Sequence, residues 1–237
     1  MKDRTLQILA ALIEDFVESA TPIASKKLLM DRHFDISSAT VRNEFAVLEE
    51  IGLIKSPHIS AGKIPTQQGY RFFVDEFLHD EKEDLQVRTL FQKYVAEYHL
   101  AKEKEIIFDI LRLLSRLSGN VAFVNIENDQ TAYIGLSNVL RSPEFISHPE
   151  KAAQIVEILE GQNRFQSMMN SLDIEKNEIK IFIGEENLLE EISSCAMLVT
   201  KFTSPRGMRG TVGILGPMRM RYAFNRALLR NALEMLG

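Results

Sequence analysis

The chain has 237 residues, of which 45% are hydrophobic and 26% are charged, and its formal net charge is −5. This composition is typical of a soluble protein with room for two modest domains, and any nucleic-acid footprint must be a local basic patch. Cys195 is the one cysteine of the sequence, which excludes a disulfide within the chain. No run of about 18 apolar residues predicts a membrane span, and the first residues lack the apolar core of a signal peptide. We therefore expect a cytoplasmic protein without membrane partners.

The first third of the chain predicts helices separated by short turns. Leu6, Leu9 and the apolar residues that follow predict a helix that Asp3 or Thr5 can cap, that runs to about Ser19 and that ends before Pro22. Ser25 is expected to cap a second, short helix that runs to about Asp31. Lys26 lies in the first turn of this helix, where it either contacts a phosphate or is solvated.

A third helix is expected to begin after Ser37 or Ser38 and to stop at Gly52, a residue suited to a left-handed cap. A spacing of four and three residues places four apolar side chains on one face, which must be buried: Val41, Phe45, Leu48 and Ile51. The opposite face carries polar side chains that can bond base edges or phosphates: Ser38, Thr40, Arg42, Asn43 and Glu44. An ordinary surface helix with a solvated face would show the same pattern.

A hairpin with a polar tip is predicted between residues 53 and 66. Lys55 and Lys63 stand at the two ends of the tip, which also holds His58 and Ser60. Two lysines in this position suit a phosphate clamp, although a plain hairpin with solvated lysines fits equally. Thr66 is expected to cap a helix from Gln67 to about Leu78, with Arg71 exposed on it. This order of elements is that of a winged helix-turn-helix.

The rest of the sequence predicts a helical segment and then a sheet with flanking helices. The charged residues 79–84 suggest a domain boundary, and a helical pattern continues to about Leu117, with a bend near 102–105. Its apolar stripes, which include Leu90, are either core or a coiled-coil seam. Strands are expected at 121–126, 131–136, 179–183, 195–202 and 210–216, and helices at 148–160, 164–172 and 218–236. This pattern indicates an α/β or α+β domain.

The sequence holds no recognisable catalytic or metal-binding pattern. No two of the five histidines have metal-ligand spacing, and Cys195 has no cysteine partner. The acidic pairs Glu185-Glu186 and Glu190-Glu191 are interpreted as solvated carboxylates near helix starts. The basic loop 205–210 could hold an anion, but it fits no phosphate-loop pattern and is expected to turn a hairpin. We expect neither an enzyme nor a cofactor.

The segments 37–54 and 57–66, together with Gly69-Tyr70-Arg71 and Val74-Asp75, closely resemble the winged-helix domain of the heat-inducible transcription repressors, the HrcA family. The family pattern Pro-His-Thr-Ser-Ala-Gly-Arg-Ile-Pro-Thr differs here at two positions. Ile59 lacks the threonine hydroxyl, and Lys63 keeps the charge of arginine but loses its bidentate geometry. The resemblance implies a repressor of chaperone genes that binds an inverted repeat of double-stranded DNA. The residues expected to contact DNA are Lys26, Ser38, Thr40, Arg42, Asn43, Lys55, His58, Ser60, Lys63 and Arg71.

The resemblance extends into the second half of the chain. It covers residues 114–122, Pro143-Glu144-Phe145, residues 183–187 and Gly216 to Tyr222. It implies an α+β protein with a winged helix-turn-helix in residues 1–79, a helical linker in 80–118 and a reduced GAF-like domain in 119–237. Family members are longer, and the missing portion, between Val124 and Thr131, is expected to include the inserted dimerising region. A homodimer is still expected, because an operator with two-fold symmetry requires a protein with two-fold symmetry.

The resemblance implies a further partner, and two alternative functions are also considered. Family members depend on a chaperonin partner for activity, which the resemblance implies here as well. One alternative is a winged-helix enzyme, for which the sequence offers neither a nucleotide loop nor a catalytic set. The other is a winged-helix regulator that senses a small molecule in its GAF-like domain, although a fold alone does not give a function.

Overall fold

The computed structural model describes residues 1–32, 34, 36–58, 61–78, 81–95, 103–127, 131–161 and 163–237. The chain mixes helices with a two-stranded and a five-stranded antiparallel sheet, so the predicted α+β class is confirmed. It divides into two compact units, Met1–Leu78 and His79–Gly237. No helix in the described ranges is long and apolar enough to cross a bilayer.

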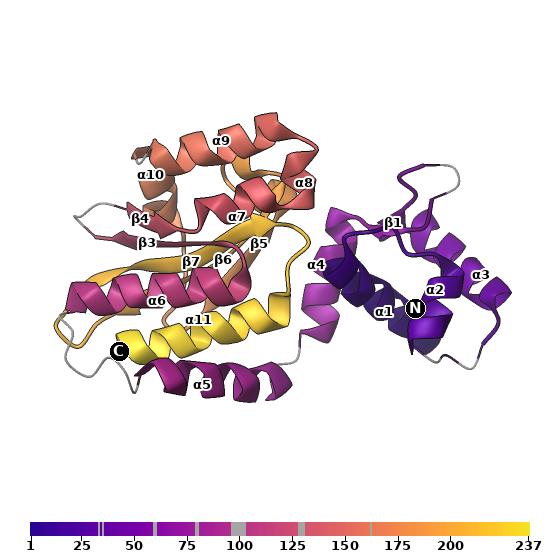
Figure 1. Ribbon diagram of the computed structural model, residues 1–237, viewed down its shortest axis with the longest axis horizontal. Coiled ribbons are helices and arrows are strands. Elements are labelled where there is room, and N and C mark those ends of the chain that lie inside the picture. Colours follow the sequence, from indigo (N-terminus) through magenta and orange to yellow (C-terminus); the bar gives the residue numbers. More distant parts are fainter. Residues whose placement is uncertain are drawn as a thin grey trace. The chain divides into compact units, whose positions relative to one another are not determined.

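The first unit contains four helices and a short hairpin (Figure 1). The helices are α1 (Asp3–Ser19), α2 (Ser25–Arg32), α3 (Ser38–Glu50) and α4 (Gln67–Phe77), and the strands are β1 (Ile54–Lys55) and β2 (Ile64–Pro65). The strands pair antiparallel, with Ile54 opposite Pro65. The predicted ranges are close to these bounds. The capping residue of α1 is Lys2, without a side-chain cap, so the prediction of Asp3 or Thr5 as its cap is wrong.

The core of the first unit forms where α1 meets the other helices. Ile8, Leu9 and Leu12 of α1 are fully buried, as are Val41 and Leu48 of α3. Phe45 is buried as predicted, but Ile51 remains 46% exposed, so the buried stripe does not extend to it. Ile51 is the C-terminal capping residue of α3, where the backbone leaves the helix before Gly52, whose φ is +78°.

A close approach of two backbones joins α4 to the hairpin. The hydroxyl of Thr66 caps α4 by accepting a hydrogen bond from Gly69 N (3.0 Å), and it donates one to the Gly52 carbonyl (2.6 Å). Thr66 N also donates to the Leu53 carbonyl at 3.1 Å. A Cβ atom on Gly69 would lie 2.1 Å from the Leu53 carbonyl oxygen, so this position requires glycine for space. The start of α4 is thereby fixed against the hairpin.

The second unit is built on one five-stranded antiparallel sheet. Its strands are β3 (Val121–Ile126), β4 (Thr131–Ile134), β5 (Ile179–Ile183), β6 (Cys195–Thr203) and β7 (Arg209–Pro217), in the order β4-β3-β7-β6-β5. The two longest strands, β6 and β7, form the predicted hairpin. The predicted turn between β3 and β4 falls largely on residues 128–130, outside the described residues.

Helices cover both faces of this sheet (Figure 1). On one face lie α7 (Leu136–Arg141), α8 (Pro143–Ile146), α9 (Pro149–Glu160) and α10 (Asn163–Ser171), and on the other lie α6 (Glu103–Ser118) and α11 (Tyr222–Leu236). The helix α5 (Glu81–Val95) packs on the outer side of α11. Two 3-10 turns, η1 (Gly184–Glu186) and η2 (Glu190–Ile192), connect β5 to β6. Phe123 of β3 and Phe165 of α10 meet edge-to-face, with ring centroids 5.0 Å apart, in the core on the α9–α10 side.

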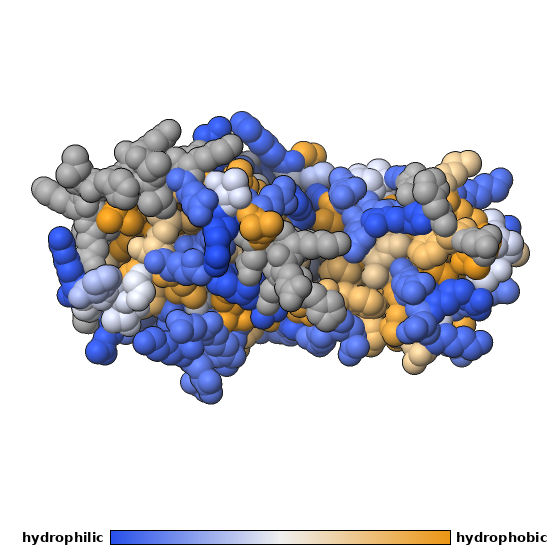
Figure 2. Space-filling view, turned by 90° about the horizontal axis from the view of Figure 1, so that it is seen from below, coloured by the Kyte–Doolittle hydropathy of each residue, from blue (hydrophilic) through white to orange (hydrophobic). Residues whose placement is uncertain are grey.

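The segment expected to be a linker belongs, where it is described, to the second unit. Val87 and Phe91 of α5 and Leu111 and Leu114 of α6 are buried, and both helices pack against α11. Leu90, assigned to the expected stripe, is half-buried. The expected bend begins at Lys102, which lies outside the described residues, as do residues 96–101. Figure 2 shows hydrophilic and hydrophobic residues intermixed on one outer face of the chain.

The final helix begins later than predicted. The sequence pattern favours a start at Met218, whereas α11 begins at Tyr222. Met218 to Met220 follow Pro217 as a bend, and Arg221 has a non-helical ψ of 80°. The Tyr222 hydroxyl donates to the Met218 carbonyl at 2.6 Å, which stabilises this bend in place of a helical turn.

Replacing Gly69 with alanine tests the close approach of α4 to the hairpin. Alanine is favoured over glycine in a helix by about 1 kcal/mol, but the clash with the Leu53 carbonyl opposes this gain. We expect Gly69→Ala to lower the free energy of unfolding by about 1–3 kcal/mol in urea denaturation followed by circular dichroism. Gln68→Ala, at the exposed neighbouring position, is the control. A Gly69→Ala variant more stable than wild type would contradict the geometry.

Candidate nucleic-acid interface

Several of the hydroxyl side chains named in the sequence pattern lie at the start of α3. Ser37 is the capping residue: its hydroxyl accepts a hydrogen bond from Thr40 N at 3.1 Å and lies 2.9 Å from the Thr40 hydroxyl. The hydroxyl of Ser38 lies 3.2 Å from that of Ser25, the first residue of α2. The starts of α2 and α3 are therefore in direct contact, which fixes the spacing between these helices.

The outer face of α3 exposes two of the predicted DNA-binding side chains. Arg42 and Asn43 are both exposed, and Arg42 Nε donates a long hydrogen bond to the Ser38 carbonyl (3.4 Å). Ala39 and Ala46 are exposed on the same helix, so small side chains surround the two polar ones. A helix face of this kind can approach another surface closely while presenting a guanidinium and an amide.

Glu44 does not belong to this outer face. Its side chain is 8% exposed and accepts hydrogen bonds from Arg4 Nε (2.9 Å) and from the Thr5 hydroxyl (2.7 Å) at the start of α1. The Thr5 bond, assisted by Arg4, lowers the pKa of the Glu44 carboxyl below its ordinary value despite the opposing effect of burial. The prediction that Glu44 faces outward is wrong, because it ties α3 to α1. The sequence spacing could have indicated the burial of Glu44, since Val41, Glu44, Phe45 and Leu48 follow the i, i+3, i+4, i+7 pattern of a buried face.

Lys63 of the hairpin is paired within the first unit. Its ammonium donates to Glu49 Oε2 at 2.5 Å and to the Ser56 hydroxyl at 2.7 Å, and that hydroxyl donates to Glu49 Oε1 at 3.1 Å. The bond from Lys63 is also the main cause of a lowered pKa for the Glu49 carboxyl. Glu49 and Ser56 carry no local sequence signal for this role, because it depends on a contact between segments distant in sequence.

The Lys63 backbone makes a second connection. Ile23 N donates to the Lys63 carbonyl and Lys63 N donates to the Ile23 carbonyl, both at 2.9 Å. A Cβ on Gly62 would lie 2.5 Å from the Ile23 carbonyl carbon, so this approach also requires glycine. The segment before α2, the hairpin and the end of α3 are thus joined at a single residue.

The remaining predicted residues lie at separate places of the first unit. Lys26, in the first turn of α2, Lys55, in β1, and His58 are exposed, and within the described residues neither lysine forms an ion pair. Arg71 is half-buried on α4, where it donates to Asp75 at 3.2 Å. Ser60 lies outside the described residues. The structure therefore brings together Lys26, Ser38, Thr40, Arg42 and Asn43 around the start of α3, and places Lys55, His58 and Lys63 on the hairpin.

In the second unit, polar residues from the segments that resemble the family form hydrogen bonds within that unit. Arg219 Nε donates to Glu144 Oε1 at 2.5 Å, and the Ser142 hydroxyl donates to Glu144 Oε2 at 2.6 Å. Burial opposes ionisation of Glu144, but these two bonds lower its pKa on balance. The Asn187 amide donates to the carbonyls of Gly184, Ile192 and Cys195. These contacts hold distant segments of the second unit together.

The described residues offer no metal site or reactive thiol. No group of three or more His, Cys, Asp or Glu side chains lies close enough to hold a metal ion among them. Burial raises the pKa of the Cys195 thiol to about 12, so this cysteine is protonated at neutral pH.

Changing Glu44 to glutamine tests the bond between α1 and α3. A lowered carboxyl pKa adds stability above the unfolded-state pKa, and this stability is lost as the pH falls through the folded-state value. We expect Glu44→Gln to lower the free energy of unfolding by about 1–3 kcal/mol near neutral pH, and by less at about pH 4. Urea denaturation at the two pH values measures this difference. Glu50→Gln, exposed on the same helix, serves as control, and a pH-independent loss would contradict the assignment.

Comparisons with known proteins bear on both units. A family model described as the HrcA protein C-terminal domain matches residues 68–224, more than half of the chain. The heat-inducible transcription repressor HrcA of Ruminiclostridium cellulolyticum is 25% identical over 323 residues, covering 94% of this chain and 92% of the relative. That of Pseudarthrobacter chlorophenolicus is 37% identical over 172 residues, covering 70% of this chain and 47% of the relative. The first alignment is longer than this chain, so the relative has positions without a counterpart here.

The fold also has a counterpart among solved structures. A crystal structure described as that of a hypothetical protein matches with a TM-score of 0.82 and 20% sequence identity, covering 100% of this chain and 97% of that one. This likeness shows a shared fold, while the family model and the repressor sequences show the kinship. The chain belongs to the HrcA family.

Proposed function

We propose that this chain is a transcriptional repressor of heat-shock genes that binds double-stranded DNA through residues 1–78, a winged helix-turn-helix. The observation that carries the proposal is the exposed Arg42–Asn43 face of α3, braced by α2 and by a hairpin, in a member of the HrcA family. Relatives are named heat-inducible transcription repressors, which agrees with this role and with a non-enzymatic protein. The second unit would then be the GAF-like domain.

In this proposal α3 enters the major groove. Arg42 can bond a guanine edge in a bidentate manner, and Asn43 can bond an adenine edge or a phosphate. The long hydrogen bond from Arg42 to the Ser38 carbonyl is weak, so its loss on DNA binding costs little. Thr40 and Ser38 are held by Ser37 and Ser25 and act chiefly by positioning the start of the helix, where backbone N–H groups favour a phosphate.

Lysine side chains at the edges of α3 complete the interface. Lys26 lies beside the start of α3, through the contact of Ser25 with Ser38, and can neutralise a phosphate of the adjacent backbone. Lys55 and His58 present polar groups from the hairpin, and Arg71 presents one from α4. Ser60, a further proposed contact, lies outside the described residues. Lys63 reaches DNA only by leaving Glu49, so we assign it to holding the hairpin in place.

The proposed operator is an inverted repeat, which requires two copies of the chain, one for each half-site. A homodimer formed through the second unit would supply them. By family resemblance, a chaperonin is the partner that keeps the repressor active.

Light scattering of the protein bound to one operator duplex should give the mass of the duplex plus two chains, because each half-site holds one chain. A mass of the duplex plus one chain would contradict the dimer.

The Arg42→Ala variant tests the role of α3. If Arg42 contacts a base, its removal should weaken operator binding by about 1–3 kcal/mol and relax the preference at one base position. Fluorescence anisotropy at fixed salt, with the operator and with single-base variants, measures both effects. Arg112→Ala, an exposed arginine on α6, is the matched control. An equal loss on all sequences would make Arg42 a phosphate contact.

Lys63 and Glu49 offer a test that separates two roles of the hairpin lysine. If Lys63 holds the hairpin, Lys63→Met and Glu49→Gln should weaken operator binding to a similar extent, and the double variant should be little worse than either. If Lys63 instead contacts a phosphate, Glu49→Gln should leave binding unchanged or stronger, because the ammonium is released. In that case Lys63→Met should also reduce the salt dependence by about one phosphate contact.

A further inference from the structure

The strand register places six polar side chains on one face at one end of the five-stranded sheet. Residues directly opposite each other share a face, as do residues two apart along a strand. Asn125, Thr211 and Lys201 are aligned across β3, β7 and β6. One step further, Glu127 N bonds the Arg209 carbonyl, and Arg209 is opposite Thr203. The two rows form a continuous polar floor.

This floor lies under a hollow of about 490 Å³. Met169 and Asn170 of α10 form its wall, and Phe202 and Gly210 complete the lining. Asn125 Nδ2 donates to Asn170 Oδ1 at 2.8 Å, which joins the floor to the wall. The volume falls within the range of about 300–1,000 Å³ that small-molecule sites occupy. The hollow lies entirely within the second unit.

The buried part of the floor has unused hydrogen-bonding capacity. Thr211 is 4% exposed, and its hydroxyl has no hydrogen-bond partner in the part of the chain that the structure describes. A buried hydroxyl without a hydrogen-bond partner destabilises the fold, because its desolvation is not compensated. Asn125 is 1% exposed and uses its oxygen to accept a bond from Thr131. Thr211 and Asn125 therefore form a buried polar base beneath the hollow.

The charges at the rim are predominantly positive. Lys201 is half-buried and Arg209 is exposed, and they are diagonal neighbours on β6 and β7. Glu127 contributes one carboxylate beside Arg209, so the lining carries a net charge of +1. Two cations next to one carboxylate suit a molecule that combines an anionic group with hydrogen-bond donors.

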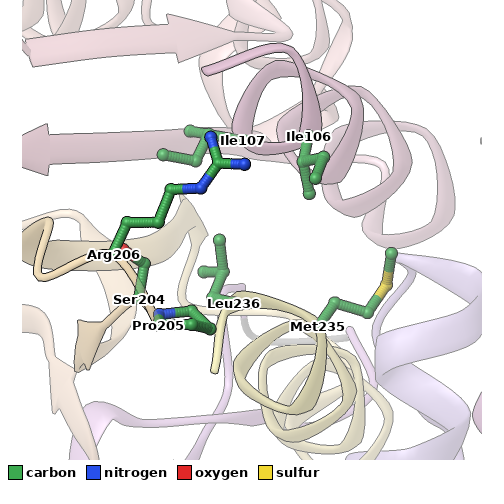
Figure 3. A pocket seen from close by; sticks show the side chains of 7 residues that line it. All are labelled: Ile106, Ile107, Ser204, Pro205, Arg206, Met235 and Leu236. Carbon is green, nitrogen blue, oxygen red and sulfur yellow. The ribbon is translucent and has the colours of Figure 1, made fainter. Parts of the chain in front are cut away.

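Arg206, in the loop between β6 and β7, and Arg209, the first residue of β7, line different hollows. Arg206 lines a separate hollow of about 180 Å³ between α6 and α11, where its guanidinium extends toward Ile107 (Figure 3). The other side chains there include Ile106, Met235 and Leu236, which are apolar. Arg209, three residues on, lines the polar hollow instead. Arg206 therefore provides a control for a site that uses Arg209.

We propose that the polar hollow binds a small organic anion, a carboxylate or phosphate that also carries hydroxyl groups. The anionic group lies between Lys201 and Arg209, and the hydroxyl groups bond Asn170 and Glu127. This site goes beyond DNA binding by the first unit, and its occupancy can be measured without DNA.

Calorimetric titration of the whole 237-residue chain tests the site with citrate as the carboxylate and adenosine monophosphate as the phosphate. Sodium chloride of the same ionic strength is the reference for non-specific ion effects. We expect saturable binding of at least one probe, weakened about tenfold or more in Lys201→Met and Arg209→Met, since each removes a charge-assisted bond. Arg206→Met should bind as wild type does, and Lys201→Arg should retain binding.

The outcome with each probe identifies the anionic group. Binding of citrate alone assigns a carboxylate, and binding of adenosine monophosphate alone assigns a phosphate. Melting temperatures of the unliganded variants close to that of wild type show that the sheet is intact. Absence of saturable binding by both probes, or equal weakening in Arg206→Met, would overturn the proposal.

Discussion

Lys63 is the residue on which the geometry of the first unit depends. Its backbone pairs with Ile23 ahead of α2, and its ammonium pairs with Glu49 near the end of α3. Ser25 and Ser38 connect the starts of the same two helices. A hairpin of two-residue strands has little stability of its own, so these contacts determine where it lies relative to α3. The placement of the hairpin is thus a property of the whole unit.

The same contacts pair two carboxylates of α3 within an acidic unit. Residues 1–79 contain nine Lys or Arg and eleven Asp or Glu, a net charge of −2. Glu44 is buried against Arg4 and Thr5, and Glu49 is paired with Lys63, so these carboxylates are not free to oppose a phosphate. Arg42 and Lys55 remain exposed. DNA affinity would then rest on a few local contacts, with a modest non-specific component.

Local sequence signals predicted the elements well, while contacts between distant segments escaped prediction. The caps at Ser37 and Thr66 and the left-handed Gly52 follow from residue type and spacing. The short helices α7 and α8 have too few residues for a periodic pattern, and they were missed. The pairing of Lys63 with Glu49 depends on tertiary structure, and it places a predicted phosphate clamp in an ion pair. The polar floor on β3, β7 and β6 likewise required the strand register.

Binding of the purified protein to DNA tests the central claim most directly. Fluorescence anisotropy would compare a duplex bearing the inverted repeat of the HrcA family with a scrambled duplex of the same length at the same salt. The account predicts a preference of about a thousandfold or more for the inverted repeat. Equal, weak binding to both duplexes would contradict it, since the winged-helix unit would then lack sequence-specific recognition.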